Sequence, residues 1–365
     1  MPDFSSRRQF LQKFSLGTSA LLLPQSERLA NRAEKKLGVA LVGLGTYSTL
    51  QLAPALQQTR RCRLAGIVTG TPEKAASWTK QYNLPPQNVY DYRSFDRLAD
   101  NPDIDIVYVV LPNSMHAEYS IRAAQAGKHV ICEKPMALNV AECAQIIAAC
   151  QKANVKLSVG YRLYFEPHHL EMRRLGTEKE YGAVKLMETS LGFSMADPKV
   201  WRLNKALGGG GAIMDLGVYA VQGARRTIGE LPMAVTAQGY VRDPAVFKGI
   251  YETVSFQMEF PGGALSNSST TYTSYVDRLH ATTGYQWFGL QPAFNATGAH
   301  GDSFKGKIEF PTPAYQQIAQ LDAFAGSILD HTPVVASGEE GRTDLSIIEA
   351  IVRAADTGCK VQVMY

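Results

Sequence analysis

The first half of the chain alternates short apolar runs with longer segments whose apolar residues recur at helical spacing. The predicted strands are 37–45, 63–68, 104–111, 129–132 and 156–160, and the predicted helices between them are 48–59, 117–126 and 140–153. The strand 104–111 is nearly all apolar, which is typical of a strand covered by helices on both faces. The repeated alternation predicts an α/β fold for residues 37–160, with a doubly wound parallel sheet of the Rossmann type.

The second half of the chain has a run of strand-like segments instead. Polar–apolar alternation, or residues that favour strands, mark the segments 183–193, 234–241, 253–260, 264–272, 278–282 and 287–290. Strands that follow one another after such a unit predict a second domain of the α+β class, which we assign to residues 161–365.

Composition and charge narrow the classes of function. The chain has 365 residues, of which 45% are hydrophobic and 19% charged, and this fits two globular domains. The formal net charge of +4 lies in residues 1–36, which hold seven Lys and Arg against three acids; 30 basic and 30 acidic residues remain. Because the remainder is neutral, its charge gives no reason to expect binding to nucleic acid or to a membrane surface.

The N-terminal segment has the features of an export signal. The sequence Ser-Arg-Arg-Gln-Phe-Leu begins at Ser6, and a mainly apolar stretch follows at 14–23. This stretch is too short to span a bilayer but matches a secretory leader, and the arginine pair is typical of the twin-arginine type. A frayed helix with a chance arginine pair is the alternative. We predict that residues 1–36 are the leader and a short linker.

Twin-arginine leaders carry folded cargo, so this leader suggests a periplasmic protein that is loaded with a cofactor before export. Cleavage is expected near Ala30 or Ala33. No other stretch is long and apolar enough to span a bilayer, which predicts a soluble mature protein.

The cysteines and histidines suggest neither a disulfide framework nor a metal site. The five cysteines contain no Cys-x-x-Cys pair and their number is odd, so we expect buried free thiols. His168 and His169 are adjacent and their side chains should diverge, and no other histidine spacing suits a metal. We therefore predict no metal.

A glycine-rich turn ends the first predicted strand. Gly43 permits a tight turn, and Gly45 lets the backbone approach a pyrophosphate at the start of the next helix. The third small position is Ser48 rather than glycine or alanine, which still allows close packing of helix and strand. The turn residues that we expect to contact a dinucleotide are Gly43, Leu44, Gly45, Thr46 and Tyr47.

The end of the second strand lacks the acidic residue that usually binds the ribose 2′-hydroxyl of NAD. Thr69 and Lys74 stand there instead, and a hydroxyl with a cation suits a 2′-phosphate. We predict that both residues bind the cofactor and that the cofactor is NADP. A solvated lysine at the start of a helix, beside Glu73, is the alternative for Lys74.

Several longer motifs point to one family. They are Leu-Pro-Asn-Ser-Met-His from Leu111, Gly-Lys-His-Val-Ile-Cys-Glu-Lys-Pro from Gly127, Gly-Tyr-Arg from Gly160, Trp-Arg-Leu from Trp201, Gly-Gly-Gly-Gly-Ala-Ile-Met-Asp-Leu-Gly-Val-Tyr from Gly208, and Gly-Glu-Glu-Gly from Gly338. With the Gly43 turn, they resemble the glucose–fructose oxidoreductase, inositol dehydrogenase and rhizopine-catabolism family over nearly all of residues 37–360. Within it, the chain is most similar to the glucose–fructose oxidoreductases.

The resemblance implies a fold for the second domain and roles for several residues. The second domain should contain a large, open, mostly antiparallel sheet that covers the active site and makes subunit contacts, so a homodimer or homotetramer is expected. Lys134 should lie beside the nicotinamide and the substrate. The other implied cofactor residues are Leu111, Asn113, His116, Glu133 and Arg162, with Trp201 and Arg202 at the nicotinamide end. Tyr161 is a further candidate for sugar contact, and stacking in the core is its alternative.

Asp215 and Tyr219 are the candidate acid–base residues beside Lys134. They are four residues apart in a segment of helical character, which would put both on one helix face, one turn apart. The structural alternative is an aspartate bonded to nearby backbone and a buried tyrosine.

Our hypothesis assigns the proton transfer to Tyr219, which would take the proton from a sugar hydroxyl while hydride leaves the same carbon. A phenol is a weak base at neutral pH, and the Lys134 ammonium within hydrogen-bond reach would favour the phenolate. Asp215 would bind and orient the sugar hydroxyls. The predicted substrate contacts are therefore Lys134, Tyr161, Arg162, Asp215 and Tyr219.

The predicted function is a periplasmic sugar oxidoreductase that retains NADP, oxidises an aldose to its lactone and reduces a second sugar carbonyl to a polyol. Free NADP is scarce outside the cytoplasm, so a tightly bound cofactor that is reduced and reoxidised in place fits an exported enzyme. The alternatives are an NAD(P)-dependent glycosidase of the same family, an ordinary NADP-dependent aldose dehydrogenase, and a non-enzymatic sugar-binding or assembly protein.

Overall fold

The computed structural model describes residues 36–195 and 197–365, so the predicted leader at 1–35 lies outside the described residues. The first sheet has six parallel strands in the order β3-β2-β1-β4-β5-β6. These strands are β1 (Leu37–Val42), β2 (Cys62–Val68), β3 (Val89–Tyr90), β4 (Ile106–Val109), β5 (His129–Cys132) and β6 (Leu157–Val159). Its strand order reverses between β1 and β4, as in dinucleotide-binding sheets, and the predicted doubly wound parallel sheet is confirmed.

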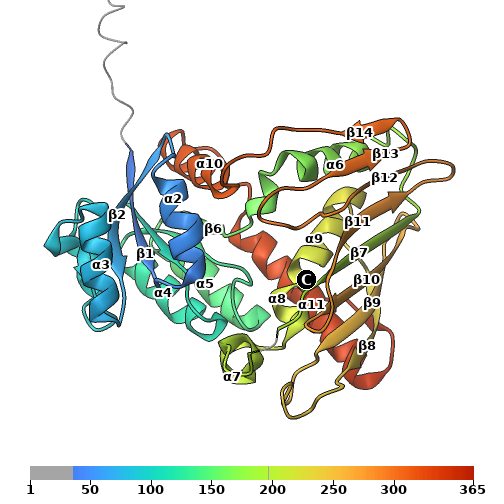
Figure 1. Cartoon of the computed structure of the whole chain (residues 1–365), viewed down its shortest axis with the longest axis horizontal. Coiled ribbons are helices and arrows are strands. Elements are labelled where there is room, and N and C mark those ends of the chain that lie inside the picture. Colours follow the sequence, from blue (N-terminus) through green and yellow to red (C-terminus); the bar gives the residue numbers. More distant parts are fainter. Residues whose placement is uncertain (1–35, 196) are drawn as a thin grey trace, which may run out of the picture. The chain divides into compact units, whose positions relative to one another are not determined.

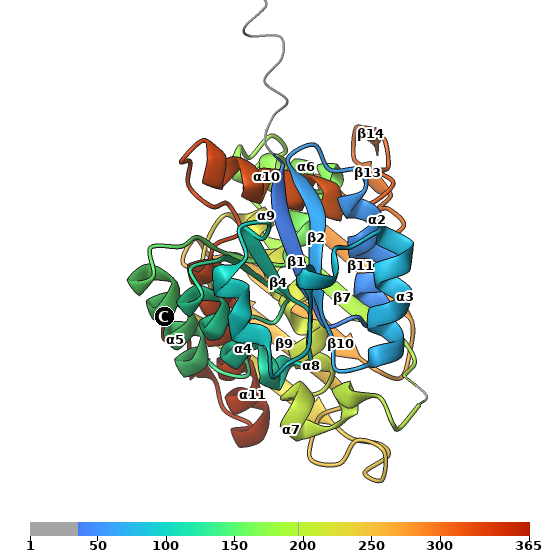
Figure 2. The same ribbon diagram turned by 90° about the vertical axis from the view of Figure 1, so that its left-hand side faces the viewer.

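Helices cover both faces of this sheet (Figure 2). They are the turn η1 (Ser48–Leu52) with α2 (Ala53–Leu56), α3 (Pro72–Tyr82), α4 (His116–Gln125) and α5 (Val140–Lys152). Alternate side chains of a strand point to opposite faces. Leu41 of β1 accordingly packs in a cluster with Leu52 and Trp78, whereas Val42 packs in a second cluster with Ala123 of α4 and Ile146 of α5. Both faces of the sheet are therefore buried.

The second sheet has nine strands in the order β14-β13-β12-β11-β7-β10-β9-β8-β15. They are β7 (Leu186–Gly192), β8 (Ala234–Tyr240), β9 (Thr253–Glu259), β10 (Leu265–Thr271), β11 (Val276–Thr282), β12 (Trp287–Leu290), β13 (Gly301–Ser303), β14 (Gly306–Ile308) and β15 (Val361–Gln362). Only the β7–β10 pair is parallel, and the other pairs are antiparallel. The predicted mostly antiparallel sheet is confirmed.

One face of the nine-stranded sheet is covered by α9 (Gly217–Ile228) and α11 (Gly338–Thr357), which lie on its inner side in Figure 1. The remaining helices and short helical turns are η2 (Pro86–Asn88), η3 (Phe95–Asp100), η4 (Asn113–Met115), η5 (Arg162–Tyr164), α6 (Pro167–Thr177), η6 (Trp201–Leu203), α7 (Lys205–Gly208), α8 (Ala212–Asp215) and α10 (Gln317–Leu329).

Helix α10 crosses the division that we predicted between residues 37–160 and 161–365. Its apolar side chains, among them Leu321 and Phe324, share a cluster with Leu41 and Leu52 of the first sheet and its first helix. The Asp322 carboxylate also accepts hydrogen bonds from the backbone N–H groups that precede β2, at 2.8 to 3.1 Å. A segment from the end of the chain is therefore part of the first packing unit.

All five cysteines lie within the described residues and carry free thiols. Four are buried as predicted, but Cys359 is exposed because it follows the end of α11 at the surface. No helix among residues 36–195 and 197–365 is long and apolar enough to cross a membrane. The described chain also holds no group of three or more His, Cys, Asp or Glu that could bind a metal ion.

Candidate active site

The glycine turn after β1 leaves open space at its tip. Gly43 has a φ of +92°, and a Cβ there would lie 2.4 Å from the carbonyl oxygen of Val110, so only glycine fits. A Cβ at Gly45 would meet nothing within 4 Å. The buried Ser48 hydroxyl donates to the Gly43 carbonyl at 2.6 Å, which explains how serine replaces the third glycine. A tight turn with free space before a helix N-terminus fits a pyrophosphate.

Lys74 reaches back from α3 to this turn. Its ammonium donates to the Leu44 carbonyl at 3.0 Å, and the Thr69 hydroxyl accepts from the Thr71 N–H at 3.2 Å. Leu44 is buried, whereas Thr46 is exposed and Tyr47 half-buried at the start of the helix. The structure therefore places a cation and a hydroxyl beside the turn, where a 2′-phosphate would lie if the cofactor is NADP.

Lys134 follows β5 and contacts the second domain. Its ammonium donates to the Asp215 backbone carbonyl and to Asp215 Oδ1, both at 2.9 Å. Burial lowers the pKa of Lys134, but Asp215 and Tyr219 outweigh burial and raise it. An ammonium has three N–H donors, so one is left for another acceptor.

The Asp215 carboxylate accepts hydrogen bonds from two side chains and is ion-paired with a third. Besides Lys134, it receives the Tyr272 hydroxyl at 3.0 Å and forms an ion pair with Arg202 at 3.2 Å, both through Oδ2. Burial raises the pKa of Asp215, but the charges of Lys134 and Arg202 with the hydrogen bonds outweigh burial and bring the pKa to about 2. Asp215 is therefore an anion whose oxygens are largely occupied by the protein's own donors.

A break in the helix gives Lys134 its second partner. The sequence predicted Asp215 and Tyr219 on one continuous helix, but α8 ends at Asp215 and α9 begins at Gly217. The Tyr219 N–H donates to the Leu216 carbonyl at 3.0 Å, three residues back. In a regular helix that N–H would bond the Asp215 carbonyl, which here accepts from Lys134 instead.

Two cations lie near the Tyr219 ring. The Lys134 nitrogen lies 4.6 Å from the ring centroid and the Arg162 guanidinium carbon 5.3 Å from it. The expected hydrogen bond from Lys134 to the phenol is not among the contacts of the described residues, and the ammonium makes a cation–π contact with the ring instead. The tilted Phe294 ring also contacts Tyr219, with 6.1 Å between the centroids.

Arg162 is buried and held in place by the second half of the chain. It donates to the Phe294 carbonyl at 2.6 Å and to the Gln316 side chain. Burial lowers the pKa of Arg162, but the neighbouring acidic groups of Tyr219, Tyr47 and Glu133 outweigh burial and raise it. The predicted cofactor residues Tyr47, Glu133 and Arg162 are thus brought together around Tyr219.

Both oxygens of the Glu133 carboxylate accept hydrogen bonds. Its Oε1 accepts from the Tyr108 hydroxyl at 2.6 Å, and its Oε2 accepts from the Lys134 N–H at 3.2 Å. Burial raises the pKa of this carboxyl.

Four further predicted site residues make contacts with their own neighbours. The Asn113 side chain donates to the Gly208 carbonyl at 2.9 Å and so joins the loop after β4 to the glycine-rich segment before α8. Leu111 is buried near that loop, and its carbonyl lies 2.8 Å from the His116 ring. Trp201 is half-buried, and its ring contacts the Arg202 guanidinium at 4.5 Å.

Tyr161 is not brought to this group. Its ring is stacked on Tyr164 with 5.2 Å between centroids, and it is buried in the core next to Asp344. Tyr161 therefore stacks in the core, which is the alternative that we gave for it.

Several residues in this site had no place in the sequence analysis. Tyr272 follows β10 and Phe294 follows β12, so both come from the far sheet, and Gln316 and Gln317 stand at the start of α10. No local motif marks them, because they reach the site only through the packing of the nine-stranded sheet and α10 on the first domain.

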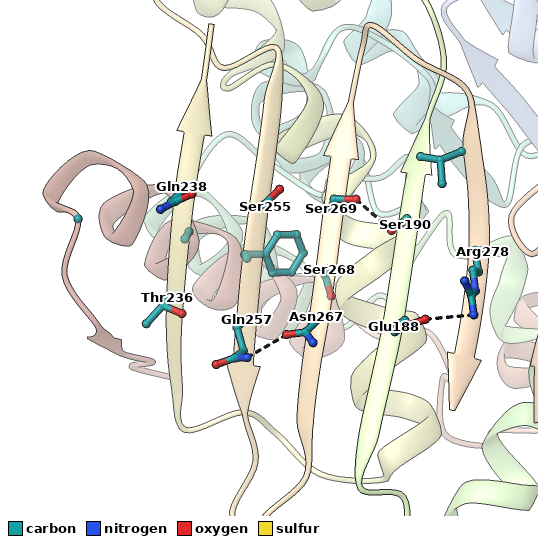
Figure 3. A pocket seen from close by; sticks show the side chains of 14 residues that line it. Glu188, Ser190, Thr236, Gln238, Ser255, Gln257, Asn267, Ser268, Ser269 and Arg278 are labelled. Carbon is teal, nitrogen blue, oxygen red and sulfur yellow. Dashed lines mark hydrogen bonds and ion pairs between the residues drawn. The ribbon is translucent and has the colours of Figure 1, made fainter. Parts of the chain in front are cut away.

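A separate hollow lies on the outer face of the nine-stranded sheet (Figure 3). Cross-strand pairs line it: Glu188 with Arg278, Ser190 with Ser269, and Gln257 with Asn267. These side chains satisfy one another and hold no buried acid or base. We therefore place the candidate active site at Lys134, Asp215 and Tyr219.

Comparisons with known proteins agree with this fold. The model of the family described as "Oxidoreductase family, NAD-binding Rossmann fold" matches residues 37–161. A second model, described as "GFO/IDH/MocA C-terminal domain", matches residues 169–302.

Individual relatives include sugar enzymes. The crystal structure of an aldose-aldose oxidoreductase from Caulobacter crescentus, complexed with glycerol, is 42% identical and covers 90% of this chain and 100% of that chain, with a TM-score of 0.87. A D-xylose 1-dehydrogenase [NADP(+)] from Haloarcula marismortui is 26% identical and covers 88% of this chain and 92% of its own length. A second D-xylose 1-dehydrogenase (NADP(+)), from Haloferax volcanii, is 29% identical over 89% of this chain and 98% of its own.

Proposed function

Because the chain belongs to the GFO/IDH/MocA oxidoreductase family, we propose that it is a sugar oxidoreductase that retains NADP and passes hydride between two sugars. One sugar, an aldose, is oxidised to its lactone, and the carbonyl of the second is reduced to a polyol. The observation that carries the proposal is the Lys134 ammonium, fixed by Asp215 and lying against Tyr219 with one donor left over. Similarity to an aldose-aldose oxidoreductase at 42% identity supports the substrate class.

The protein's own residues supply the proton chemistry. The remaining Lys134 donor binds the oxygen of the sugar carbon that reacts, and Tyr219 takes the proton from that hydroxyl. In the reverse half-reaction, Tyr219 returns the proton to the carbonyl oxygen of the second sugar. A bound NADP supplies the hydride acceptor in its oxidised form and the hydride donor in its reduced form.

Asp215 has a different role from the one that the sequence suggested. Its oxygens already accept from Lys134 and Tyr272 and are ion-paired with Arg202, which leaves little capacity for sugar hydroxyls. We infer that Asp215 positions Lys134 and Arg202 and balances their charge. Arg202 is ion-paired with Asp215 and partly exposed, so its guanidinium can donate to sugar hydroxyls.

Export supports the retained cofactor. The twin-arginine pattern at Arg7 and Arg8 is that of a folded, cofactor-loaded periplasmic protein. Outside the cytoplasm, a cofactor that is reduced and reoxidised in place needs no supply. For the assembly, we propose that the outer sheet face in Figure 3 packs against a second copy, because no helix of the described residues covers this face.

An ordinary NADP-dependent aldose dehydrogenase is the second candidate, and the names of the two archaeal relatives favour it. The test is to incubate purified protein with an aldose and a second carbonyl sugar, without added nucleotide, and to measure both products. The proposal expects lactone and polyol in equal amounts over many turnovers. Product that forms only when NADP is added, with no polyol, would establish the second candidate.

A further inference from the structure

The N-terminal end of α10 reaches the middle of the candidate site. The Gln317 amide Nε2 donates to the Tyr47 hydroxyl at 3.0 Å, and the preceding Gln316 accepts from Arg162. Tyr47 stands two residues after Gly45, and burial together with the charge of nearby Glu133 raises the pKa of its hydroxyl. Gln317 therefore contacts the helix start that follows the pyrophosphate turn, and its neighbour Gln316 contacts Arg162 of the candidate site.

The other end of the Gln317 amide has no partner in the described chain. Gln317 is 1% exposed, and its Oε1 is buried and without a hydrogen bond among the described residues. If the amide were flipped, its nitrogen would be the unpaired atom, so one atom of the Gln317 amide lacks a partner in either orientation. A buried amide oxygen without a hydrogen-bond donor is unfavourable, and a ligand that donates to it would relieve that cost.

Gln320, one turn further along α10, provides a comparison. It is also 1% exposed, donates to the fully buried Tyr108 hydroxyl at 2.9 Å, and has an unpaired Oε1. Tyr108 stands in β4, and its hydroxyl donates to the Glu133 carboxylate at 2.6 Å. The two glutamines thus share residue type, helix, burial and an unpaired atom, but only Gln317 contacts a residue of the cofactor turn.

The position of Gln317 matches one end of a dinucleotide. With the pyrophosphate at Gly45 and the reacting carbon near Lys134 and Tyr219, the nicotinamide must lie between them. Its carboxamide carries an N–H donor and a carbonyl acceptor, and a glutamine amide complements both. We propose that Gln317 binds the nicotinamide carboxamide and that α10 thereby holds the reactive end of the cofactor on the first domain. This inference rests on the proposed function, because it requires a nicotinamide cofactor.

The consequence is a route to slow cofactor release. Helix α10 is fixed to the first domain by Leu321 and Phe324 and by the Asp322 carboxylate. A contact from this rigid helix to the carboxamide adds affinity at the nicotinamide end, beyond the contacts at the pyrophosphate and the 2′-phosphate.

Binding measurements on the nucleotide-stripped protein test this inference without reference to activity. The ligands are NADP+, its analogue that lacks the nicotinamide (2′-phospho-ADP-ribose), and the 3-acetylpyridine analogue, in which a methyl ketone replaces the carboxamide. We expect Gln317→Leu to weaken NADP+ binding at least tenfold and to change the affinity for 2′-phospho-ADP-ribose less than about twofold. The matched variant Gln320→Leu should leave the ratio of these two affinities as in the wild type.

The wild-type protein gives a test that does not depend on any variant folding. It should bind NADP+ more tightly than the 3-acetylpyridine analogue, and Gln317→Leu should remove that difference. Equal wild-type affinity for these two ligands, or a Gln317→Leu effect that is the same with and without the nicotinamide, would overturn the inference and leave the proposed function standing. A wild-type protein that binds none of the three would instead contradict the proposed function.

Discussion

At the scale of single residues, Tyr219 carries the proposed proton transfer, and two cations lie close to its ring. We predict that Tyr219→Phe lowers the rate of sugar oxidation by about 10²–10⁴-fold, because the phenol proton acceptor is lost while the ring contacts remain. Single-turnover hydride transfer in the presence of an aldose measures this rate. NADP affinity should stay near the wild-type value.

Tyr272→Phe is the matched control for this prediction. The Tyr272 hydroxyl contacts Asp215 Oδ2, and its removal leaves that oxygen with Arg202. A clearly smaller loss of rate is therefore expected. If Tyr219→Phe keeps full hydride transfer, the acid–base assignment of Tyr219 is wrong.

The buried His116 predicts how stability depends on pH. Burial lowers the pKa of His116 to about 4, against about 6.5 in an unfolded chain. Between these values the unfolded chain binds the extra proton, so this group's contribution to stability is complete above about pH 6.5 and is lost as the pH falls to about 4. The loss is about 1.4 kcal/mol per pH unit, measurable by urea unfolding at several pH values.

Two variants separate this effect from the rest of the protein. His116→Gln should reduce the pH dependence of the unfolding free energy between about pH 6.5 and 4. The exposed His331, whose φ of +55° also suits asparagine, is the control, and His331→Asn should leave the pH dependence unchanged. An unchanged slope in His116→Gln would show that this histidine is not kept neutral by burial.

Residue types were easier to identify from the sequence than their contacts. Lys134, Asp215 and Tyr219 were named from motifs and are brought together by the fold. The sequence did not show that Asp215 is occupied by Arg202 and Tyr272, because Tyr272 comes from a strand of the far sheet. Contacts of that kind depend on packing between distant segments.

At the scale of elements, the two glycines of the turn after β1 have different roles. Gly43 is required by the fold, and Gly45 leaves space for the pyrophosphate. We predict that Gly45→Ala folds with wild-type stability but binds NADP+ at least about tenfold more weakly, because its added methyl group enters the space for the pyrophosphate. Gly43→Ala should instead destabilise the fold, because of the positive φ and the nearby Val110 carbonyl. Thermal unfolding and nucleotide titration of both variants check this. A Gly45→Ala protein with unchanged affinity would contradict the placement of the pyrophosphate.

Lys74, in the first turn of α3, is expected to determine whether the protein prefers NADP or NAD. Lys74→Ala should weaken NADP+ binding about tenfold or more and leave NAD+ binding unchanged, because Lys74 lies beside the turn where the 2′-phosphate is expected. Lys80, exposed on the same helix, is the control, and Lys80→Ala should change neither affinity. Parallel titrations with the two nucleotides give the result. Equal losses of affinity for NADP+ and NAD+ would indicate that Lys74 only stabilises the turn and does not bind the 2′-phosphate.

Most of the strands were predicted, whereas the helices α3, α6, α10 and α11 were not. The strand at His129–Cys132 matches its prediction at both ends, and all six strand-like segments of the second half lie in the nine-stranded sheet. The strands β13, β14 and β15 were missed because two or three residues show no period. The break between α8 and α9 was missed because Leu216 keeps helical backbone angles.

At the scale of the whole molecule, α10 joins the end of the chain to the first sheet. This helix comes from the region assigned to the second domain, but it packs on the first helix of the Rossmann sheet and brings Gln316 and Gln317 to the site. Sequence order alone could not show this, because the return depends on the tertiary path after β14. Under the proposed function, the same path would let one chain contact both ends of the dinucleotide.

The central claim is that the protein keeps its NADP and cycles it between two sugars. The most direct test is the absorbance spectrum of protein purified without added nucleotide and freed of small molecules by gel filtration. We predict that a bound nicotinamide gains the near-ultraviolet band of its reduced form when glucose is added and loses it when fructose or another carbonyl sugar follows. A protein that emerges empty and reacts only with added NADP would contradict the claim, as would a bound cofactor that does not respond to free sugars.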